Sequence, residues 1–221
     1  MDARKLTLKK YMTMKKILSM VMVAVASVFA PATASAQWFD DGSFDILKNA
    51  NVVMSSEGLE IFKGDNGLYG YKDESGKIVI ACQWKDATVF REGLALVKDD
   101  SGKWGIIDKK GKQVTPCKWN HAASFSEQLA AVQDDHDKWG FIDKKGKLVI
   151  PCKWNRAASF SEQLAAVQDD HGKWGYINKK GKLVIPCKWN STYSFKKGKA
   201  KVTDDNGKFH IINKAGKVVK K

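Results

Sequence analysis

The chain has 221 residues and carries 38 Lys and Arg against 24 Asp and Glu, a formal net charge of +14. No segment after residue 36 is apolar over enough residues to cross a bilayer as a helix, which excludes a helical membrane domain there. The positive charge comes mostly from Lys. A Lys-rich surface has two interpretations: solvated turns that block edge-to-edge aggregation, or a contact surface for an anionic polymer.

Residues 1–36 have the three parts of a secretory signal peptide. Six basic residues precede an apolar stretch of 14 residues at 17–30, which is too short to span a bilayer, and small residues occupy 34–36. We therefore expect cleavage before Gln37 and export to the periplasm or the cell exterior. Removing six basic residues and one acidic residue leaves 32 against 23, a net charge of +9. Two internal methionines are alternative starts: Met12 and Met14.

One pattern then recurs at a fixed interval of 35 residues. It begins with an aromatic residue followed by Gly: Tyr69-Gly70, Trp104-Gly105, Trp139-Gly140 and Trp174-Gly175, with Phe209 in a fifth, degenerate copy. Three more rows keep this register: Phe90, Phe125, Phe160 and Phe195; Cys82, Cys117, Cys152 and Cys187; Trp84, Trp119, Trp154 and Trp189. Self-similarity at this period indicates a tandem-repeat architecture. A residue present once per unit is better explained by building the unit than by catalysis, which needs a unique constellation.

Each unit is predicted to contain three short strands. In the copy at 156–190 we expect strands at 164–168, 173–178 and 183–185, the last either ending at 185 or continuing to Trp189. An Asp-rich turn and a Lys-Lys-Gly-Lys turn join them. Pro186 lacks an N–H group, so it marks an edge or the end of a strand. No stretch after the leader has a convincing helical period.

The strand faces predict how the units assemble. Trp174 and Tyr176 point to one face and Gly175 to the other, and both faces also carry aliphatic residues. A single meander would leave one apolar face exposed to water, so the units must stack to bury it. Gly175 weakens its strand unless a group packs against its bare backbone, and the neighbouring Trp is the candidate.

The segment 102–112, Gly-Lys-Trp-Gly-Ile-Ile-Asp-Lys-Lys-Gly-Lys, resembles the bacterial WG repeat, also called the KWG repeat. Residues 149–151 match its apolar-Pro step and 90–95 its aromatic and Glu-Gly-Leu-Ala step, and the resemblance covers about 57–221. The departures are Tyr69 for Trp, Phe209-His210 for Trp-Gly, and Gln128 and Gln163 for the loop Gly. Atypical terminal units are expected as caps. The family varies in repeat number and is usually presumed to mediate binding.

The predicted fold is all-β. Five tandem units at 57–221, each a three-stranded antiparallel meander, stack as an open solenoid-like array, and residues 37–56 cap the N-terminal end. The variable repeat number that the resemblance implies favours the open array, because a closed propeller-like ring needs a set number of units. The closed ring is the alternative.

The four cysteines, one per unit, have two interpretations. In an exported protein Cys82–Cys117 and Cys152–Cys187 could be disulfides if stacking brings equivalent positions within bridging distance. We favour a row of small buried thiols. The spacing is not that of a zinc site, and turn chemistry explains the Asp pairs beside His136 and His171 without a ligand. We expect no metal and no cofactor.

Two surfaces are candidates for binding a partner. Successive turns of a meander lie at opposite ends of its strands, so Asp-Asp turns line one edge and Lys turns the other. The Lys candidates are Lys109, Lys110, Lys144, Lys145, Lys179 and Lys180. The second Trp row is expected to be more exposed than the Trp-Gly row, and it could stack on sugar rings or grip a protein: Trp84, Trp119, Trp154 and Trp189.

These features predict an exported, non-enzymatic binding or structural module of the cell envelope. Its expected partner is a protein or an envelope glycan, anionic glycans included. Recognised nucleic-acid motifs are absent, so nucleic acid is not expected. Two alternatives stay open: a hydrolase acting on cell-wall material and a purely structural subunit of a larger assembly.

Overall fold

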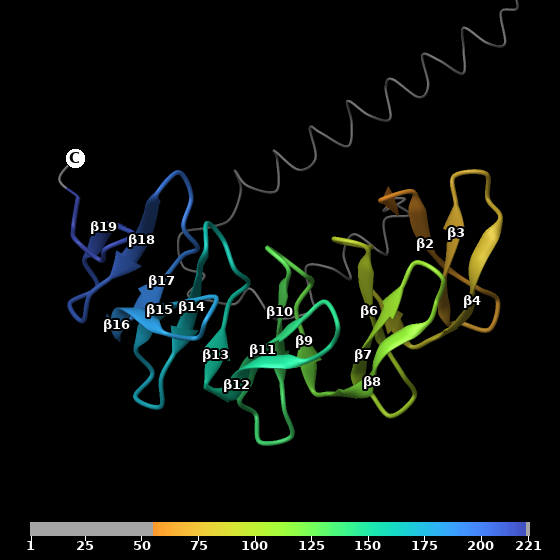
Figure 1. Cartoon of the computed structure of the whole chain (residues 1–221), viewed down its shortest axis with the longest axis horizontal. Helices are drawn as coiled ribbons and strands as arrows, with labels where there is room; N and C mark the ends of the chain where they lie inside the picture. Colours follow the sequence, from red (N-terminus) through yellow and green to blue (C-terminus); the bar gives the residue numbers. More distant parts are fainter. Residues whose placement is uncertain (1–54, 220–221) are drawn as a thin grey trace, which may run out of the picture. The chain divides into compact units, whose positions relative to one another are not determined.

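The polypeptide folds into five small antiparallel sheets that follow one another along the chain, one sheet per 35-residue unit (Figure 1). The computed structural model describes residues 55–219, and this part of the chain contains no helix. The predicted signal peptide (1–36) and nearly all of the predicted cap (37–56) lie outside the described residues. The all-β repeat architecture expected from the sequence is confirmed.

Strands that are adjacent in sequence are hydrogen-bonded neighbours in every sheet. The first sheet contains β1 (Ser55–Ser56), β2 (Leu59–Lys63), β3 (Tyr69–Asp73) and β4 (Ile78–Trp84). The second contains β5 (Asp86–Ala87), β6 (Leu94–Lys98), β7 (Trp104–Asp108) and β8 (Gln113–Trp119). The third contains β9 (His121–Ala122), β10 (Leu129–Gln133), β11 (Trp139–Asp143) and β12 (Leu148–Trp154). The fourth contains β13 (Arg156–Ala157), β14 (Leu164–Gln168), β15 (Trp174–Asn178) and β16 (Leu183–Trp189), and the fifth contains β17 (Ser191–Thr192), β18 (Lys199–Thr203) and β19 (Phe209–Asn213).

The first four sheets each have one strand more than the predicted three-stranded meander. The three long strands of the fourth sheet lie where they were expected, except that β15 starts one residue later and β16 continues to Trp189. The additional strand of this sheet, β13, has only two residues and pairs with the end of β14. A strand this short carries no period of its own in the sequence, which is why the pattern did not reveal it.

The tight turns are organised by a carboxylate or amide at their first position. In the turn after β11, Asp143 Oδ1 accepts hydrogen bonds from the backbone N–H groups of Lys145 and Lys147, at 2.9 and 3.0 Å. Gly146 in this turn has a φ of +78°, a conformation that favours Gly. Asp169 binds the N–H groups of its own turn in the same way. The first Asp of each acidic turn therefore serves the turn itself.

The Gly of the Trp-Gly motif accommodates a bulge of the next strand in its own sheet. Trp174 pairs with Trp189 and Tyr176 pairs with Ile185, so residues 186–188 of β16 all lie opposite Gly175. A Cβ atom at Gly175 would lie only 2.5 Å from the carbonyl oxygen of Ile185. The expectation that a neighbouring Trp packs on this Gly is therefore wrong. Pro186 fits in the bulge because bulged residues leave the ladder of hydrogen bonds.

The hydrophobic cores lie between successive sheets. The core between the third and fourth sheets is formed by Leu129, Ala131, Trp139, Phe141, Ile150, Trp154, Ala157, Phe160, Ala165, Val167 and Ile177. Two equivalent cores join the first sheet to the second and the second to the third. The second, third and fourth sheets thus bury both faces, as the two apolar faces of their strands predict.

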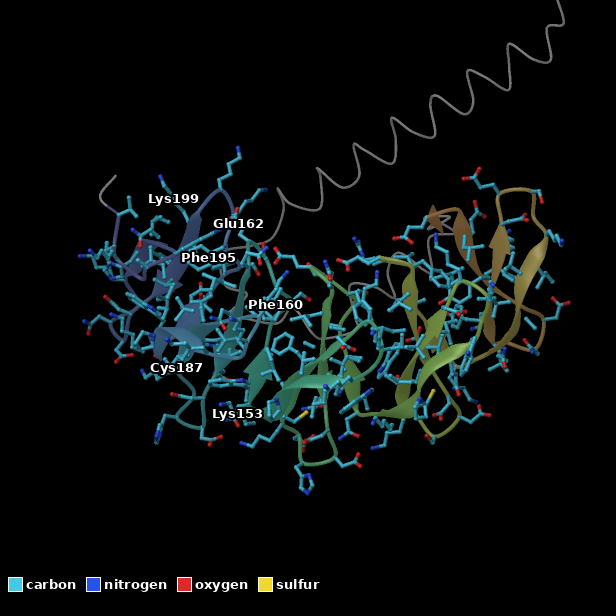
Figure 2. The ribbon with its side chains drawn as sticks, viewed as in Figure 1. Lys153, Phe160, Glu162, Cys187, Phe195 and Lys199 are labelled. Carbon is cyan, nitrogen blue, oxygen red and sulfur yellow. The ribbon has the colours of Figure 1, made fainter. Side chains whose placement is uncertain are left out.

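The Phe row connects one sheet to the next. The rings of Phe141 and Phe160 meet edge to face, with centroids 4.9 Å apart. Tyr176 and Phe195 repeat this contact one unit later, at 4.8 Å. Phe160 and Phe195 are both fully buried (Figure 2). Each Phe therefore comes from the loop of one unit and packs on the sheet before it.

The last sheet differs from the earlier sheets in the residues of one face. Lys199 and Lys201 of β18 stand at the register positions of the buried Leu164 and Ala166 of β14. Phe209 is 54% exposed, whereas Trp174, one unit earlier, is 5% exposed. The face of the last sheet that carries these residues is thus polar and exposed to solvent. Within residues 55–219 the five sheets are not hydrogen-bonded to one another. The described chain is an open solenoid-like array, and the closed ring is not formed.

Candidate binding surface

The Asp turns and the Lys turns lie at opposite ends of the strands, as the sequence predicts. In the fourth sheet the Asp turn at 169–172 comes directly before β15, and the Lys turn at 179–182 comes directly after it. The same order holds in the second and third sheets. We call the end that carries 109–112, 144–147 and 179–182 the Lys-turn edge.

The opposite edge is occupied by polar contacts between successive units. Lys138 Nζ donates to Asn155 Oδ1 at 2.6 Å and to Asp170 Oδ1 of the next unit at 2.5 Å. Two other lysines make equivalent contacts: Lys103 with Asn120 and Asp135, and Lys173 with Asn190 and Asp205. The hydrogen bond and charge of Lys138 lower the pKa of Asp170. The acidic turns therefore connect successive units through hydrogen bonds and ion pairs with these lysines.

The histidines beside the Asp turns do not form a metal site with them. His136 and His171 are exposed at the turns, and each donates its backbone N–H to the first Asp of its turn. No group of three or more metal-ligating side chains gathers within the part of the chain that the structure describes.

Part of the Lys-turn edge is also engaged in holding units together. Lys109 Nζ lies 3.1 Å from Glu57 Oε2, and Lys179 Nζ lies 3.3 Å from Glu127 Oε2. The carboxylate of Glu127 also accepts the backbone N–H of Gln163 at 3.0 Å. Each Glu thus ties its loop to both the loop and the Lys turn of the next unit. Two of the six candidate lysines, Lys109 and Lys179, therefore have an internal role.

The remaining lysines of this edge offer their charge to solvent. Lys110, Lys144, Lys145 and Lys180 are exposed, and none has an ion pair with another residue described in the structure. The last Lys of each turn is likewise exposed: Lys112, Lys147 and Lys182. The edge thus presents a series of uncompensated ammonium groups, one set per unit in the second, third and fourth sheets.

The expectation that the second Trp row is more exposed than the first is wrong. Its members are all buried, with exposed fractions of 7% for Trp84, 6% for Trp119, 9% for Trp154 and 6% for Trp189. Trp154 is paired across the strands with Trp139, which is equally buried at 6%. The ammonium group of Lys153 lies 5.0 Å from the centre of the Trp154 ring. Both Trp rows therefore belong to the cores between sheets, and the bulge that carries Cys and Lys turns the indole inward.

Sequence reasoning missed a set of exposed aliphatic residues at the start of the third long strand. Leu183 and Val184 are 41% and 40% exposed, and only Ile185 is buried, at 1%. Nine large hydrophobic side chains are exposed in the described part of the chain, and seven of them occupy these two register positions: Ile78, Val79, Leu148, Val149, Leu183, Val184 and Val218. A signal was present, because three consecutive apolar residues on an outer strand cannot all face the core.

The four cysteines are free, half-buried thiols. Burial raises the pKa of Cys117, Cys152 and Cys187 to about 11. Cys187 Sγ would lie 2.8 Å from a Cβ atom at Gly175, so the thiol fills the space that the Gly leaves open. The free thiols agree with the favoured interpretation, and the disulfide pairing is not formed.

We expect these three thiols to react slowly in the folded protein. At pH 8 a pKa of about 11 in place of 9 leaves about a hundredfold less thiolate, which is the reactive species. Iodoacetamide labelling followed by mass spectrometry should show rates at least that much slower in native buffer than in concentrated urea. Equal rates in the two conditions would contradict burial of the row.

Solved structures with similar strand arrangements share little sequence with this chain. The computationally designed Ika8 protein is 11% identical, over 76% of this chain and 60% of its own, with a TM-score of 0.49. BamB from Moraxella catarrhalis is 13% identical, over 75% and 58%, with a TM-score of 0.43. The WD40 beta propeller domain of Doa1 is 12% identical, over 73% and 67%, with a TM-score of 0.36. The chain thus spans about three fifths of the first two proteins, and these likenesses carry no conclusion about function.

Comparison with curated proteins finds no match. In the described part of the chain, no helix has the length and hydrophobicity needed to cross a membrane. The family model for the WG containing repeat matches four consecutive segments, 69–104, 104–138, 139–174 and 174–209. Each segment is one repeat period that runs from one Trp-Gly strand to the next, and it contains the bulge, the Phe contact and the inter-sheet core described above. Together the segments cover well over half of the 221 residues. The protein therefore belongs to the family of WG containing repeat proteins.

Proposed function

We propose that this protein is an exported, non-enzymatic binding or structural module of the cell envelope, which contacts an anionic glycan or protein through its Lys-turn edge. The observation that carries the proposal is the set of exposed lysines without ion pairs that recurs in three successive units. The basic leader and apolar stretch of residues 1–36 support export. The residues that recur in every unit build the cores and ties, which supports a scaffold.

A tandem array suits a polymeric partner. Each turn offers two or three ammonium groups, whose individual attraction for an anion in water is weak. Binding one unit places the next unit close to the same polymer, so the weak contacts reinforce one another. The positive charge along one edge also speeds encounter with a polyanion, and added salt weakens this attraction.

The test is binding of the mature chain to polygalacturonate, a soluble polyuronate, with neutral dextran as the comparison. We expect saturable binding to the polyuronate at 50 mM salt, weaker binding at 200 mM salt, and none to dextran. The variant K110Q/K145Q/K180Q should bind on the order of tenfold more weakly or worse, because three exposed charges are removed.

The matched control is K118Q/K153Q/K188Q. These three lysines are exposed, lie in the same units and carry the same charge, but they stand beside Trp at the opposite end of the strands. The control should retain most of the binding. Failure of the unaltered protein to bind any anionic polymer or envelope extract would overturn the proposal, and equal losses in both triple variants would reject the assignment to the Lys-turn edge.

A further inference from the structure

The Lys turns are followed directly by exposed aliphatic side chains. In the third unit Lys147 precedes Leu148 and Val149, which are 43% and 38% exposed. In the fourth unit Lys182 precedes Leu183 and Val184, which are 41% and 40% exposed. An isolated exposed Leu is ordinary, but recurrence at the same register position is not.

These residues are exposed because of their place in the sheet. β12 and β16 are the outer strands of their sheets, and their first residues come straight out of the Lys turn. Leu148 lies opposite the buried Ile142, but it is at the end of the strand, where the next sheet does not cover it. The core ends at Ile150, which is 1% exposed.

The aliphatic pairs and the lysines coincide fully in two units. The third and fourth sheets each present a Lys-Lys-Gly-Lys turn and an aliphatic pair. The second sheet has the lysines, but Gln113 takes the first position of its pair, and the first sheet has the pair Ile78 and Val79 behind a turn that contains Asp73 and Glu74. The combined surface is therefore defined by residues 144–149 and 179–184.

We propose that residues 144–149 and 179–184 dock on an anionic lipid surface. The exposed ammonium groups meet the anionic headgroups, and the aliphatic side chains enter the boundary between headgroups and acyl chains. This inference goes beyond the proposed function: it adds an anionic lipid surface to the glycan or protein as a partner of the same Lys-turn edge. It explains the exposed Leu and Val side chains, which a soluble polyanion would leave in water.

The backbone of the same strands disfavours a protein that would add a strand to the sheet. Pro151 and Pro186 lie exposed in β12 and β16, and neither has an N–H group to donate. The bulge around each Pro lies in the pairing of β12 with β11 and of β16 with β15, and it bends and twists these edge strands away from the form that an added strand requires. A lipid surface needs no backbone hydrogen bonds, so these features do not oppose it.

The test is sedimentation of the mature chain with vesicles of phosphatidylglycerol and phosphatidylethanolamine, compared with vesicles of phosphatidylcholine alone. We expect binding to the anionic vesicles and little to the zwitterionic ones. K145Q/K180Q should weaken vesicle binding on the order of 25-fold, at about fivefold for each lysine near the surface. The control K153Q/K188Q should bind nearly as well as the unaltered chain.

The apolar contribution separates this inference from the proposed function. L148Q/L183Q should weaken vesicle binding about tenfold, because two half-exposed Leu side chains no longer leave water, and should leave polygalacturonate binding unchanged. Y193Q/F209Q removes two exposed aromatic residues of the last unit and should have little effect. Vesicle binding by L148Q/L183Q equal to that of the unaltered chain would overturn the inference. Binding to polygalacturonate but not to vesicles would overturn it and leave the proposed function standing, and binding to neither would overturn both.

Discussion

Replacing Gly140 by Ala is expected to destabilise the protein by about 3 kcal/mol or more, near the upper end of overpacking effects. A Cβ atom there would lie 2.5 Å from the carbonyl oxygen of Ile150 and 2.7 Å from the backbone nitrogen of Cys152. Both atoms belong to the backbone of β12, so relief requires opening the bulge between β11 and β12. Urea denaturation followed by circular dichroism would measure the loss.

A matched control for this substitution is Gly172→Asp. Gly172 has a φ of +74°, but the position is open, with its nearest heavy atom 3.8 Å from a built Cβ. The preceding unit already has Asp137 at this register position with a φ of +58°. We expect G172D to lose less than about 1 kcal/mol, the ordinary cost of leaving Gly at such a site. A G140A variant as stable as G172D would show that the Trp-Gly motif has another purpose than the bulge.

Replacing Trp154 by Ala is expected to cost about 3–5 kcal/mol of folding free energy, the usual range for truncating a buried Trp. Trp154 is 9% exposed and shares the core between the third and fourth sheets with Trp139 and Phe160. Stability in stacked repeats comes largely from interfaces between neighbours, so loss of a central interface weakens the whole array. Thermal and urea unfolding of the mature chain would measure the effect.

The same variant distinguishes a core role from a binding role for the second Trp row. Polygalacturonate binding by W154A, measured where the variant is still folded, should stay within a few-fold of normal. The control K153A keeps the indole but removes the Lys side chain whose ammonium group lies above the ring, an exposed cation–π contact worth about 0.5–1 kcal/mol. A W154A protein of normal stability that no longer binds its partner would restore the Trp row as a contact surface.

The sequence by itself determined the parts of this protein that depend on local order and repetition. The 35-residue period defined the units, and the apolar pattern and turn residues located the three long strands that the first four sheets share. The meander then required the Asp and Lys turns to lie at opposite ends. These conclusions need only the geometry of a strand and a hairpin, which act over a few residues.

Tertiary structure alone decided which groups meet between and across the units. The sequence shows that Trp174 and Trp189 recur, but only the pairing of β15 with β16 shows that both are buried and that three residues bulge over Gly175. The ties from Lys138 to Asp170 join residues 32 positions apart, and no local pattern identifies such partners. Burial and exposure are set by what the next sheet covers. The outer strands therefore begin with Leu and Val in solvent beside the Lys turns, although their composition resembles that of a core.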